Sequence, residues 1–225
     1  MTPPGADRRQ RLVDAARALF AEHPYDQVTT TAISKRAGVA YGLLAHHFEN
    51  KRGIYRAAMN EIAVEIANVH LTAPPPDATL VEQLRHALRN HVDYIDSHAP
   101  SFVAFIRGDL GSDPEQQSAV NDLRWLGAQR ILLALGITEP VPATLRTAMK
   151  GWVGALDEMM IDRIEHQDVD ADVLVDLATA TLVTTLKTVA AMDATLGLDP
   201  ELLDAAYLPG PFGHRSSDPA STRIC

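Results

Sequence analysis

One short stretch, residues 29–48, constrains the fold more than any other part of this chain. Thr29 is a good helix N-cap, because its hydroxyl can accept a hydrogen bond from an amide of the first turn. Ile33 and Ala37 follow at the i, i+4 spacing of one buried helix face. Gly38 ends that helix, since glycine readily adopts the left-handed backbone that a tight corner requires. The pattern predicts a short helix that ends in a sharp turn.

A second short helix follows the turn, from about residue 40 to residue 48. Val39 lies in the corner as an apolar plug, and Leu44 and Phe48 form the inward face of the second helix. Two short helices joined by a glycine-containing turn form a helix-turn-helix, whose second helix enters the DNA major groove. The alternative is an ordinary corner of an all-helical protein, so the surrounding sequence must distinguish the two.

Charge along the chain supports the DNA-binding interpretation. Residues 1–60 contain nine Lys or Arg and five Asp or Glu, a formal charge of +4, whereas the rest of the chain carries −13. The overall charge of −9 argues against a nucleic-acid-binding protein when it is taken alone. The asymmetry instead indicates a basic head on an acidic body.

Residues 9–60 resemble the DNA-binding domain of the TetR (tetracycline repressor) family of bacterial regulators. The resemblance covers about fifty residues at fixed spacing, and it rests on Leu12, Ala16, Leu19, Phe20, Thr29-Thr30, Ile33-Ser34-x-x-Ala37-Gly38-Val39, Gly42-x-Leu44-x-x-His47-Phe48 and Lys51. Two positions depart from the family pattern. Ala40 replaces the usual Ser or Thr cap, and Ala45 replaces a tyrosine that usually helps to hold the DNA.

The resemblance implies an all-α fold of about nine or ten helices. An N-terminal three-helix DNA-binding domain with the helix-turn-helix would precede a larger helical domain for effector binding and dimerisation. We expect a disordered N-terminus over residues 1–7, the DNA-binding domain over 8–60, the effector-binding and dimerisation domain over 61–208, and a disordered tail over 209–225. The expected helices are 8–22, 30–37, 40–48, 51–70, 79–98, 100–107, 113–135, 142–166, 171–196 and 199–207. The expected N-terminal caps of the later helices are Asn50, a capping box of Thr79 and Glu82, Asp113 and Asp170.

Several signals exclude other classes of protein. The one cysteine, Cys225, allows no disulfide framework and no thiolate metal cluster, and we expect neither metal nor cofactor. The N-terminus lacks the apolar region of a signal peptide. The longest strongly apolar stretch, 177–192, is interrupted by threonines and by Lys187, so it falls short of the roughly 18 apolar residues of a membrane span. We expect a cytoplasmic protein with no membrane partner.

The expected helix faces and the resemblance together assign eleven residues to DNA binding. The exposed side of the second helix and the preceding helix would contact bases through Tyr41, Leu43, Ala45, His46 and Thr31. Thr29, Thr30, His47 and Lys51 match family positions that contact phosphates, and Ala40 and Gly42 begin the recognition helix. Helix N-termini attract phosphate in any case, which favours a role for Lys51.

The last two long helices point to a homodimer. The helix over 171–196 is apolar or threonine-bearing almost all round, so it must be covered on both sides. It lies either at the centre of its domain or against a second subunit, and we favour the second arrangement. The expected interface residues are Leu156, Ile164, Val183, Leu186 and Val189.

Aromatic and methionine side chains in the second domain suggest an effector pocket. We expect it to be lined by Phe102, Phe105, Trp125, Trp152, Met159 and Met160, with Arg107 or Arg124 facing an anionic end of the ligand. Alternatively, these aromatics simply fill the core.

Together these features predict a ligand-responsive transcriptional regulator that binds a near-palindromic double-stranded operator as a homodimer. We favour a repressor that is released by a small apolar or amphipathic effector. No phosphate loop, nucleophile elbow or metalloprotease motif occurs, so we do not expect an enzyme. The alternative is an all-α enzyme or a protein-interaction module that retains the helix-turn-helix as a scaffold.

Overall fold

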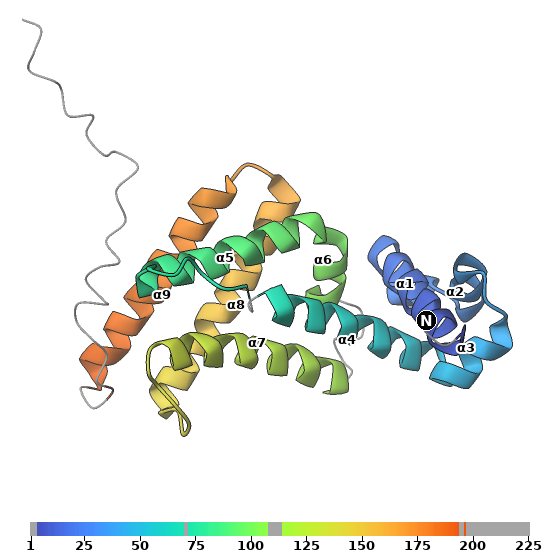
Figure 1. The fold of residues 1–225 in the computed structure, drawn as a ribbon, viewed down its shortest axis with the longest axis horizontal. Helices are drawn as coiled ribbons and strands as arrows, with labels where there is room; N and C mark the ends of the chain where they lie inside the picture. Colours follow the sequence, from blue (N-terminus) through green and yellow to red (C-terminus); the bar gives the residue numbers. More distant parts are fainter. Residues whose placement is uncertain (1–3, 70–71, 108–113, 194–195, 197–225) are drawn as a thin grey trace, which may run out of the picture.

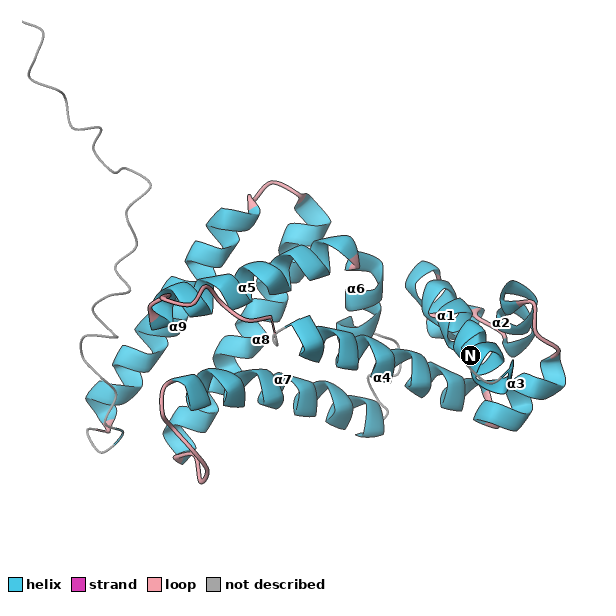
Figure 2. Ribbon diagram, viewed as in Figure 1, coloured by secondary structure: helices cyan, strands magenta, loops and turns pink. Residues whose placement is uncertain are grey.

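The computed structural model describes residues 4–69, 72–107, 114–193 and 196, and over these ranges the chain is helical without strands (Figures 1 and 2). This confirms the predicted all-α fold. The helices are α1 Pro4–Glu22, α2 Thr30–Ala37, α3 Tyr41–Phe48, α4 Lys51–Val69, α5 Leu80–Ser97, α6 Ala99–Arg107, α7 Pro114–Ala134, α8 Ala143–His166 and α9 Ala171–Met192, with a 3-10 turn, η1 Tyr25–Gln27.

Helices α1 to α3 form a small unit at one end of the molecule, which we call the head (Figure 1). Helix α1 packs against α2 and along α4. Leu12 of α1, Ile33 of α2, Leu44 of α3 and Ile54 of α4 are fully buried between them. The i, i+4 faces expected from the sequence therefore meet in one apolar core.

The predicted helix ends in the head follow local side-chain chemistry. The Thr29 hydroxyl accepts a hydrogen bond from the Ala32 amide at 3.1 Å, as an N-cap should. Gly38 has φ +62° and adopts the left-handed conformation that ends α2. The Asn50 side chain accepts from the Gly53 amide at 3.0 Å and caps α4. These three predictions are confirmed.

Two helix ends differ from the prediction. Helix α1 begins at Pro4, so residues 4–7, which we expected to be disordered, form its first turn. Proline suits the first helical position and Asp7 complements the helix dipole, which explains the earlier start. Helix α9 ends at Met192 rather than near residue 196, because Asp193 adopts an extended backbone.

The caps of the body helices follow the prediction only in part. Thr79 and Glu82 form the expected capping box of α5. Asp170 occupies the N-cap position of α9, but its side chain makes no capping hydrogen bond. The expected Asp113 cap, the helix over 199–207 and the tail over 209–225 lie outside the described residues.

Helices α5 to α9, together with the second half of α4, form the larger unit, which we call the body (Figure 1). Helix α9 packs against both α5 and α8, and α7 packs against α4 and α8. The indole nitrogen of Trp152 donates to the Ala178 carbonyl oxygen at 3.1 Å, which fastens α8 to α9.

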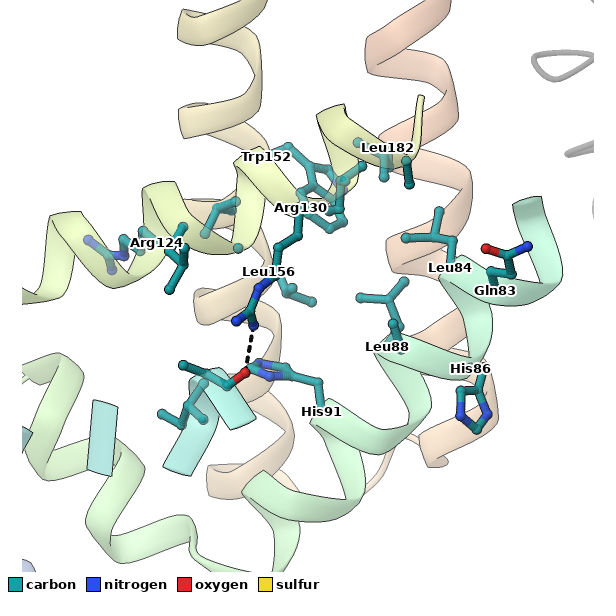
Figure 3. Close-up of a pocket in the computed structure, with 18 of the residues that line it drawn as sticks. Gln83, Leu84, His86, Leu88, His91, Arg124, Arg130, Trp152, Leu156 and Leu182 are labelled. Carbon is teal, nitrogen blue, oxygen red and sulfur yellow. Dashed lines mark hydrogen bonds between the residues drawn. The ribbon is translucent and has the colours of Figure 1, made fainter. Parts of the chain in front are cut away.

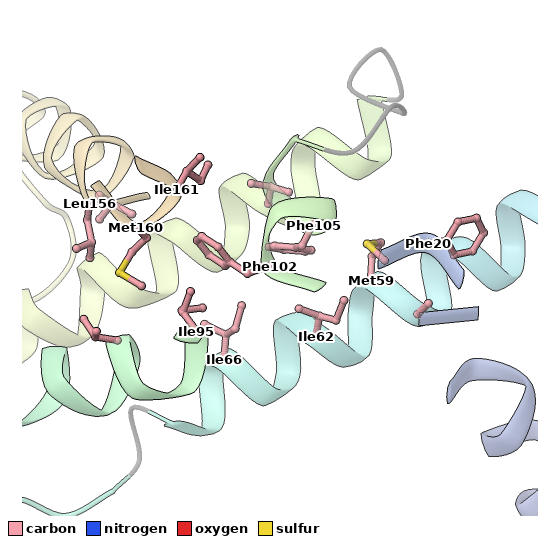
Figure 4. Close-up of a cluster of buried hydrophobic side chains, with 14 of the residues drawn as sticks. Phe20, Met59, Ile62, Ile66, Ile95, Phe102, Phe105, Leu156, Met160 and Ile161 are labelled. Carbon is pink, nitrogen blue, oxygen red and sulfur yellow. The ribbon is translucent and has the colours of Figure 1, made fainter. Parts of the chain in front are cut away.

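Helix α4 belongs to both units. Ile54 and Ala58 are buried in the head, and Ile62 and Ile66 are buried further along the same helix in the body. Figure 4 shows buried side chains following α4 from Phe20 of the head to the cluster around α5, α6 and α8. The apolar core is therefore continuous along the helix that connects the two units.

Candidate functional site

The outer face of α3 carries most of the expected DNA-reading residues. Tyr41 is 55% exposed. Gly42, Ala45 and His46 are also exposed, and Thr31 of α2 is exposed beside them. Their accessibility is as predicted, and their contacts with DNA remain a prediction.

Leu43 does not lie on the open face as we expected. It is half-buried and packs against the core of the head. Helix α3 contacts α1, α2 and α4, so its inward stripe is wide enough to include Leu43 as well as Leu44. A thymine-methyl contact by Leu43 is therefore not supported by its position.

The expected phosphate-contacting residues surround this face. Thr29 is exposed, Thr30 and His47 are half-buried, and the His47 ring centroid lies 5.4 Å from that of His46. The Lys51 ammonium lies 4.1 Å from the centre of the Tyr25 ring, a cation–π distance. Lys51 is the first residue of α4, and this contact places its ammonium group against the Tyr25 ring. Ala40 is exposed and occupies the N-cap position of α3 without a side-chain hydrogen bond.

Arg11 of α1 holds the turn of the helix-turn-helix, a role that the sequence pattern did not predict. Its guanidinium donates to the Ala37 carbonyl oxygen at 2.6 and 3.1 Å and to the Gly38 carbonyl oxygen at 2.9 Å. These carbonyls end α2, where a cation is favourable. No local pattern marks Arg11, because the contact joins residues more than twenty positions apart.

The body contains a partly open cavity of about 280 Å³ between α4, α5, α6, α7, α8 and α9 (Figure 3). Four of the predicted pocket residues line it, namely Phe102, Phe105, Arg124 and Trp152. Most of the remaining lining is aliphatic and comes from α5, α7 and α9. An apolar cavity with a few polar groups is typical of small-molecule sites.

The other four predicted pocket residues lie elsewhere. Arg107 forms ion pairs with Glu158 at 3.1 Å and Glu165 at 2.7 Å on α8. Trp125 and Met159 are half-buried outside the lining, and Met160 is fully buried in the core. Composition indicated a pocket in this domain, but it did not determine which side of each helix faces the cavity.

Charged groups enter the cavity lining at a few points. Arg124 Nε donates to Asp157 Oδ2 at 2.6 Å. Burial raises the pKa of the Asp157 carboxyl, although the Arg124 guanidinium opposes this shift. Arg130 Nη1 donates to the Ala67 carbonyl oxygen at 2.5 Å, and the nearly buried His91 lies beside this contact (Figure 3).

Neither Arg130 nor His91 was predicted as a pocket residue, although the sequence of α7 indicates that Arg130 faces inward. Leu123, Gly127, Arg130, Ile131 and Ala134 form one helical stripe along α7, and all five line the cavity. An arginine in an otherwise small and apolar stripe marks an inward-facing charge.

Four of the five predicted dimer-interface residues are buried within the protomer. Leu156, Val183 and Leu186 line the cavity, and Val189 is buried in the lining of a groove between α8 and α9. Ile164 is half-buried against the core. Contacts of these residues with a second subunit remain a prediction.

The outward side of α9 carries different residues. Val173 and Leu177 are 55% and 47% exposed. Further along α9, a shallow groove is lined mainly by threonines of α8 and α9, among them Thr147, Thr184 and Thr188. Among the described residues, α9 thus leaves apolar and threonine side chains uncovered in the protomer.

An ion-pair cluster joins the head to the body. The Arg17 guanidinium donates to both carboxylate oxygens of Glu65, at 2.6 and 2.7 Å, and the Tyr94 hydroxyl donates to Glu65 at 2.6 Å. The hydrogen bond from Arg17 is the main reason that the pKa of Glu65 is lowered. Burial, followed by the hydrogen bond to Glu65, raises the pKa of Tyr94. Helices α1, α4 and α5 meet at this cluster.

Metal binding and membrane insertion are two other possible roles for such a chain. Within the described ranges, no group of three or more His, Cys, Asp or Glu is arranged to hold a metal ion. Helix α9 is long and apolar enough to cross a membrane by length and composition, so the interrupted stretch that we judged too short does pass this test as part of the whole helix. Its inward side is buried, as in the core helix of a soluble protein.

Family models match both units of the chain. Residues 12–58 match the model of bacterial regulatory proteins of the tetR family, and residues 80–190 match the tetracyclin repressor-like C-terminal domain. The chain is 31% identical over 125 residues to the transcriptional repressor AcnR of Corynebacterium diphtheriae, covering 56% of this chain and 59% of that protein. It is 23% identical over 130 residues to the regulator BetI of Cronobacter sakazakii, covering 57% and 63%.

Solved structures share the fold. A tetR-family regulator from Streptomyces coelicolor superposes with a TM-score of 0.76 at 24% identity, covering 96% of this chain and 94% of that one. The regulator FadR from Bacillus subtilis, solved in complex with stearoyl-CoA, superposes with a TM-score of 0.64 at 21% identity, covering 78% and 98%. The alignments with AcnR and BetI span less than two thirds of those relatives.

Proposed function

Because this chain belongs to the TetR family of bacterial regulatory proteins, we propose that it is a ligand-responsive transcriptional repressor. One observation carries the proposal: α4 runs from beneath the exposed recognition helix to the wall of a largely apolar cavity. A single rigid element thus connects a surface suited to DNA with a site suited to a small molecule. We place the protein in the cytoplasm, where its operator is.

Helix α3 would lie in the major groove with Tyr41, Ala45 and His46 facing the bases, joined by Thr31 from α2. Tyr41 offers both an apolar ring for thymine methyls and a hydroxyl for hydrogen bonding. Thr29, Thr30, His47 and Lys51 would contact the phosphates on either side, which orients the head without reading sequence. Ala40 and Gly42, at the start of α3, have no side chain that prevents close approach to the DNA backbone.

The homodimer would form through the outward side of α8 and α9. Val173 and Leu177 supply exposed apolar area, and Gly151 and Gly154 of α8 leave room for a partner helix to approach closely. A Cβ atom placed on either glycine meets nothing within 4 Å in the protomer. A two-fold dimer places two heads on half-sites about 34 Å apart or a multiple of that spacing, so the operator is a near-palindrome.

A small apolar or amphipathic molecule in the cavity would release the operator. Such a molecule must bind the DNA-incompetent arrangement of the two heads more tightly than the competent one. A tenfold loss of operator affinity requires about 1.4 kcal/mol of this coupling. Helix α4 transmits the change because both units pack on it.

Selection of bound sites from random duplex DNA tests this function. We expect a near-palindromic site whose affinity falls steeply with salt concentration. Lys51→Ala should weaken binding to all sequences alike and lower the salt slope by about one unit for each phosphate that Lys51 neutralises, or about two per dimer. The rival interpretation, an all-α enzyme or interaction module that retains the helix-turn-helix as a scaffold, predicts that no duplex is enriched.

A further inference from the structure

Two arginines of α7 line the cavity, and they are bonded differently. Arg124 is paired with the buried carboxylate of Asp157 at 2.6 Å, so its charge is balanced. Arg130 donates instead to the backbone carbonyl oxygen of Ala67, and among the described residues no carboxylate forms an ion pair with it. A charge in an apolar lining without a counter-ion is costly. Arg130 is therefore where the cavity attracts an anion most strongly.

The cavity lining is polar next to the Arg130 guanidinium and becomes apolar with distance from it. The His91 ring, which is 6% exposed, lies beside the contact between Arg130 and Ala67 (Figure 3). Leu88 and Leu156 flank this region, and the lining continues towards Leu84, Trp152 and Leu182. This distribution suits a molecule with one anionic end and an apolar remainder.

The partner of Arg130 lies in the last turn of α4. The final four carbonyl groups of a helix lack partners within the helix, and a guanidinium both satisfies them and complements the helix dipole. Arg130 thus ties α7 to the C-terminal end of α4, whose other end begins at Lys51 in the head.

We propose that the effector is a monocarboxylic acid with an apolar body, and that its carboxylate competes with the Ala67 carbonyl oxygen for the Arg130 guanidinium. This inference rests on the proposed function and specifies its ligand. A carboxylate can accept two parallel charge-assisted hydrogen bonds, which are stronger than a bond to a neutral carbonyl. Loss of the Arg130 contact then frees the C-terminal end of α4.

The size and charge of the cavity favour this class over larger anions. Its volume of about 280 Å³ lies just below the roughly 300–1,000 Å³ usual for ligand pockets. One unbalanced guanidinium matches one negative charge, whereas a multiply charged head group would require further cations. Arg124 does not supply one, because Asp157 already neutralises it.

A panel of matched ligands tests the proposal. Straight-chain, branched and aromatic bodies are each supplied as the carboxylic acid, its methyl ester and the corresponding amine. Trp125→Phe leaves Trp152, which lines the cavity, as the only tryptophan, so its fluorescence reports binding. For bodies that fit, we expect the acid to bind about tenfold or more tightly than its ester, and the amine to bind less tightly than either.

Variants of Arg130 show whether this preference arises there. Arg130→Gln should bind acid and ester alike, and Arg130→Lys should retain part of the preference because it keeps the charge. The proposal would be overturned if the unmodified protein bound acid and ester equally, or if no acid bound. It would also be overturned if Arg130→Gln kept the full preference for the acid. The acid–ester comparison stands by itself if Arg130→Gln fails to fold.

The link to α4 has its own readout. Bound acid should accelerate amide hydrogen exchange in the last turn of α4 and weaken operator binding, whereas the ester should do neither. Unchanged exchange in a protein saturated with acid would overturn the link. Failure of the proposed function is separate, because it appears as the absence of duplex binding in ligand-free protein, while fluorescence reports the cavity without DNA.

Discussion

The head and the body solve different physical problems with the same kind of element. In the head, three helices and the start of α4 close on fully buried side chains such as Leu12 and Ile33. In the body, the packed helices leave a cavity of about 280 Å³. The body therefore retains a space of ligand size among its helices.

Charge separates the two units as clearly as packing does. The first sixty residues carry +4 and the remainder carries −13. Like-charge repulsion keeps the body away from the DNA phosphates, and the positive head is drawn towards them. The asymmetry therefore orients the protein on DNA before any specific contact forms.

The largest effect should come from separating the two protomers. Leu177→Glu places a charge on the outward side of α9, where the side chain is 47% exposed, so the fold should survive. Losing the second head should weaken operator binding by about a hundredfold or more. Sedimentation should show a monomer, and a gel-shift titration should show the weaker affinity.

Leu133→Glu is the matched control for the dimer. Leu133 is 65% exposed on α7 and is not among the residues that line the groove of α8 and α9. The Leu133→Glu variant should remain a dimer and should bind the operator with unchanged affinity. If Leu177→Glu remained a dimer with full affinity, the proposed interface would be wrong.

Next in size is the effect of the exposed aromatic residue on the head. Tyr41→Ala should cost about 1–3 kcal/mol of operator binding and broaden the range of bound sequences. Tyr41→Phe, which keeps the ring, should retain the apolar part of this energy. Competition between the selected operator and single-base variants measures both quantities, and a Tyr41→Ala protein with unaltered specificity would remove Tyr41 from the reading face.

Two glycines of the head should respond in opposite directions to the same change. Gly38→Ala forces alanine into a left-handed conformation and brings its Cβ to 3.0 Å from Arg11 Nη2. We expect it to lower the free energy of unfolding by about 1–2 kcal/mol. Gly42→Ala lies within α3 with no atom near its Cβ, and it should raise stability by up to about 1 kcal/mol.

Chemical denaturation of the two glycine variants distinguishes backbone strain from a general loss of head stability. If both variants were equally stable, the turn would not require glycine. Operator binding by Gly42→Ala tests separately whether the start of α3 approaches the DNA backbone.

The smallest effect should come from the cluster that joins the two units. Glu65 has a lowered pKa in the folded protein, mainly because Arg17 donates to it. Its stabilising contribution is therefore complete above its usual pKa of 4.5 and is lost as the pH falls through the lowered value. Since the pair is partly exposed, Glu65→Gln should cost less than about 1 kcal/mol at neutral pH.

Denaturation of Glu65→Gln and the unmodified chain across acidic pH tests this sign. The difference in unfolding free energy should shrink as the pH falls below the usual glutamate range. A difference that grew on acidification would contradict the assignment.

Sequence reasoning succeeded where local chemistry decides the structure. The Thr29 cap, the left-handed Gly38 and the Thr79–Glu82 capping box depend on neighbours within a few residues, so all three could be predicted. Arg11 could not, because its partners at the end of α2 come close only in the folded head.

The body shows the opposite limit. The sequence of α9 places apolar or threonine residues on all of its sides. It therefore did not predict which side would pack against other helices of the same chain. Val183 and Leu186 turned inward beneath α5, while Val173 and Leu177 stayed exposed. Whether inward side chains fill a space or border a cavity depends on how several helices cross, which no single helix encodes.

The central claim is that occupancy of the body cavity controls the head. Gly127 of α7 lines the cavity, and a Cβ placed there meets no atom within 4 Å, so the first atom of a Gly127→Leu side chain fits and the rest should occupy space that a ligand needs. The decisive measurement is the affinity for the selected operator, with and without an acid that binds the cavity, for both proteins. We predict that the acid lowers the affinity of the unmodified chain by about tenfold or more and leaves Gly127→Leu unaffected. An equal response of the two proteins, or no response of the unmodified chain, would contradict the account.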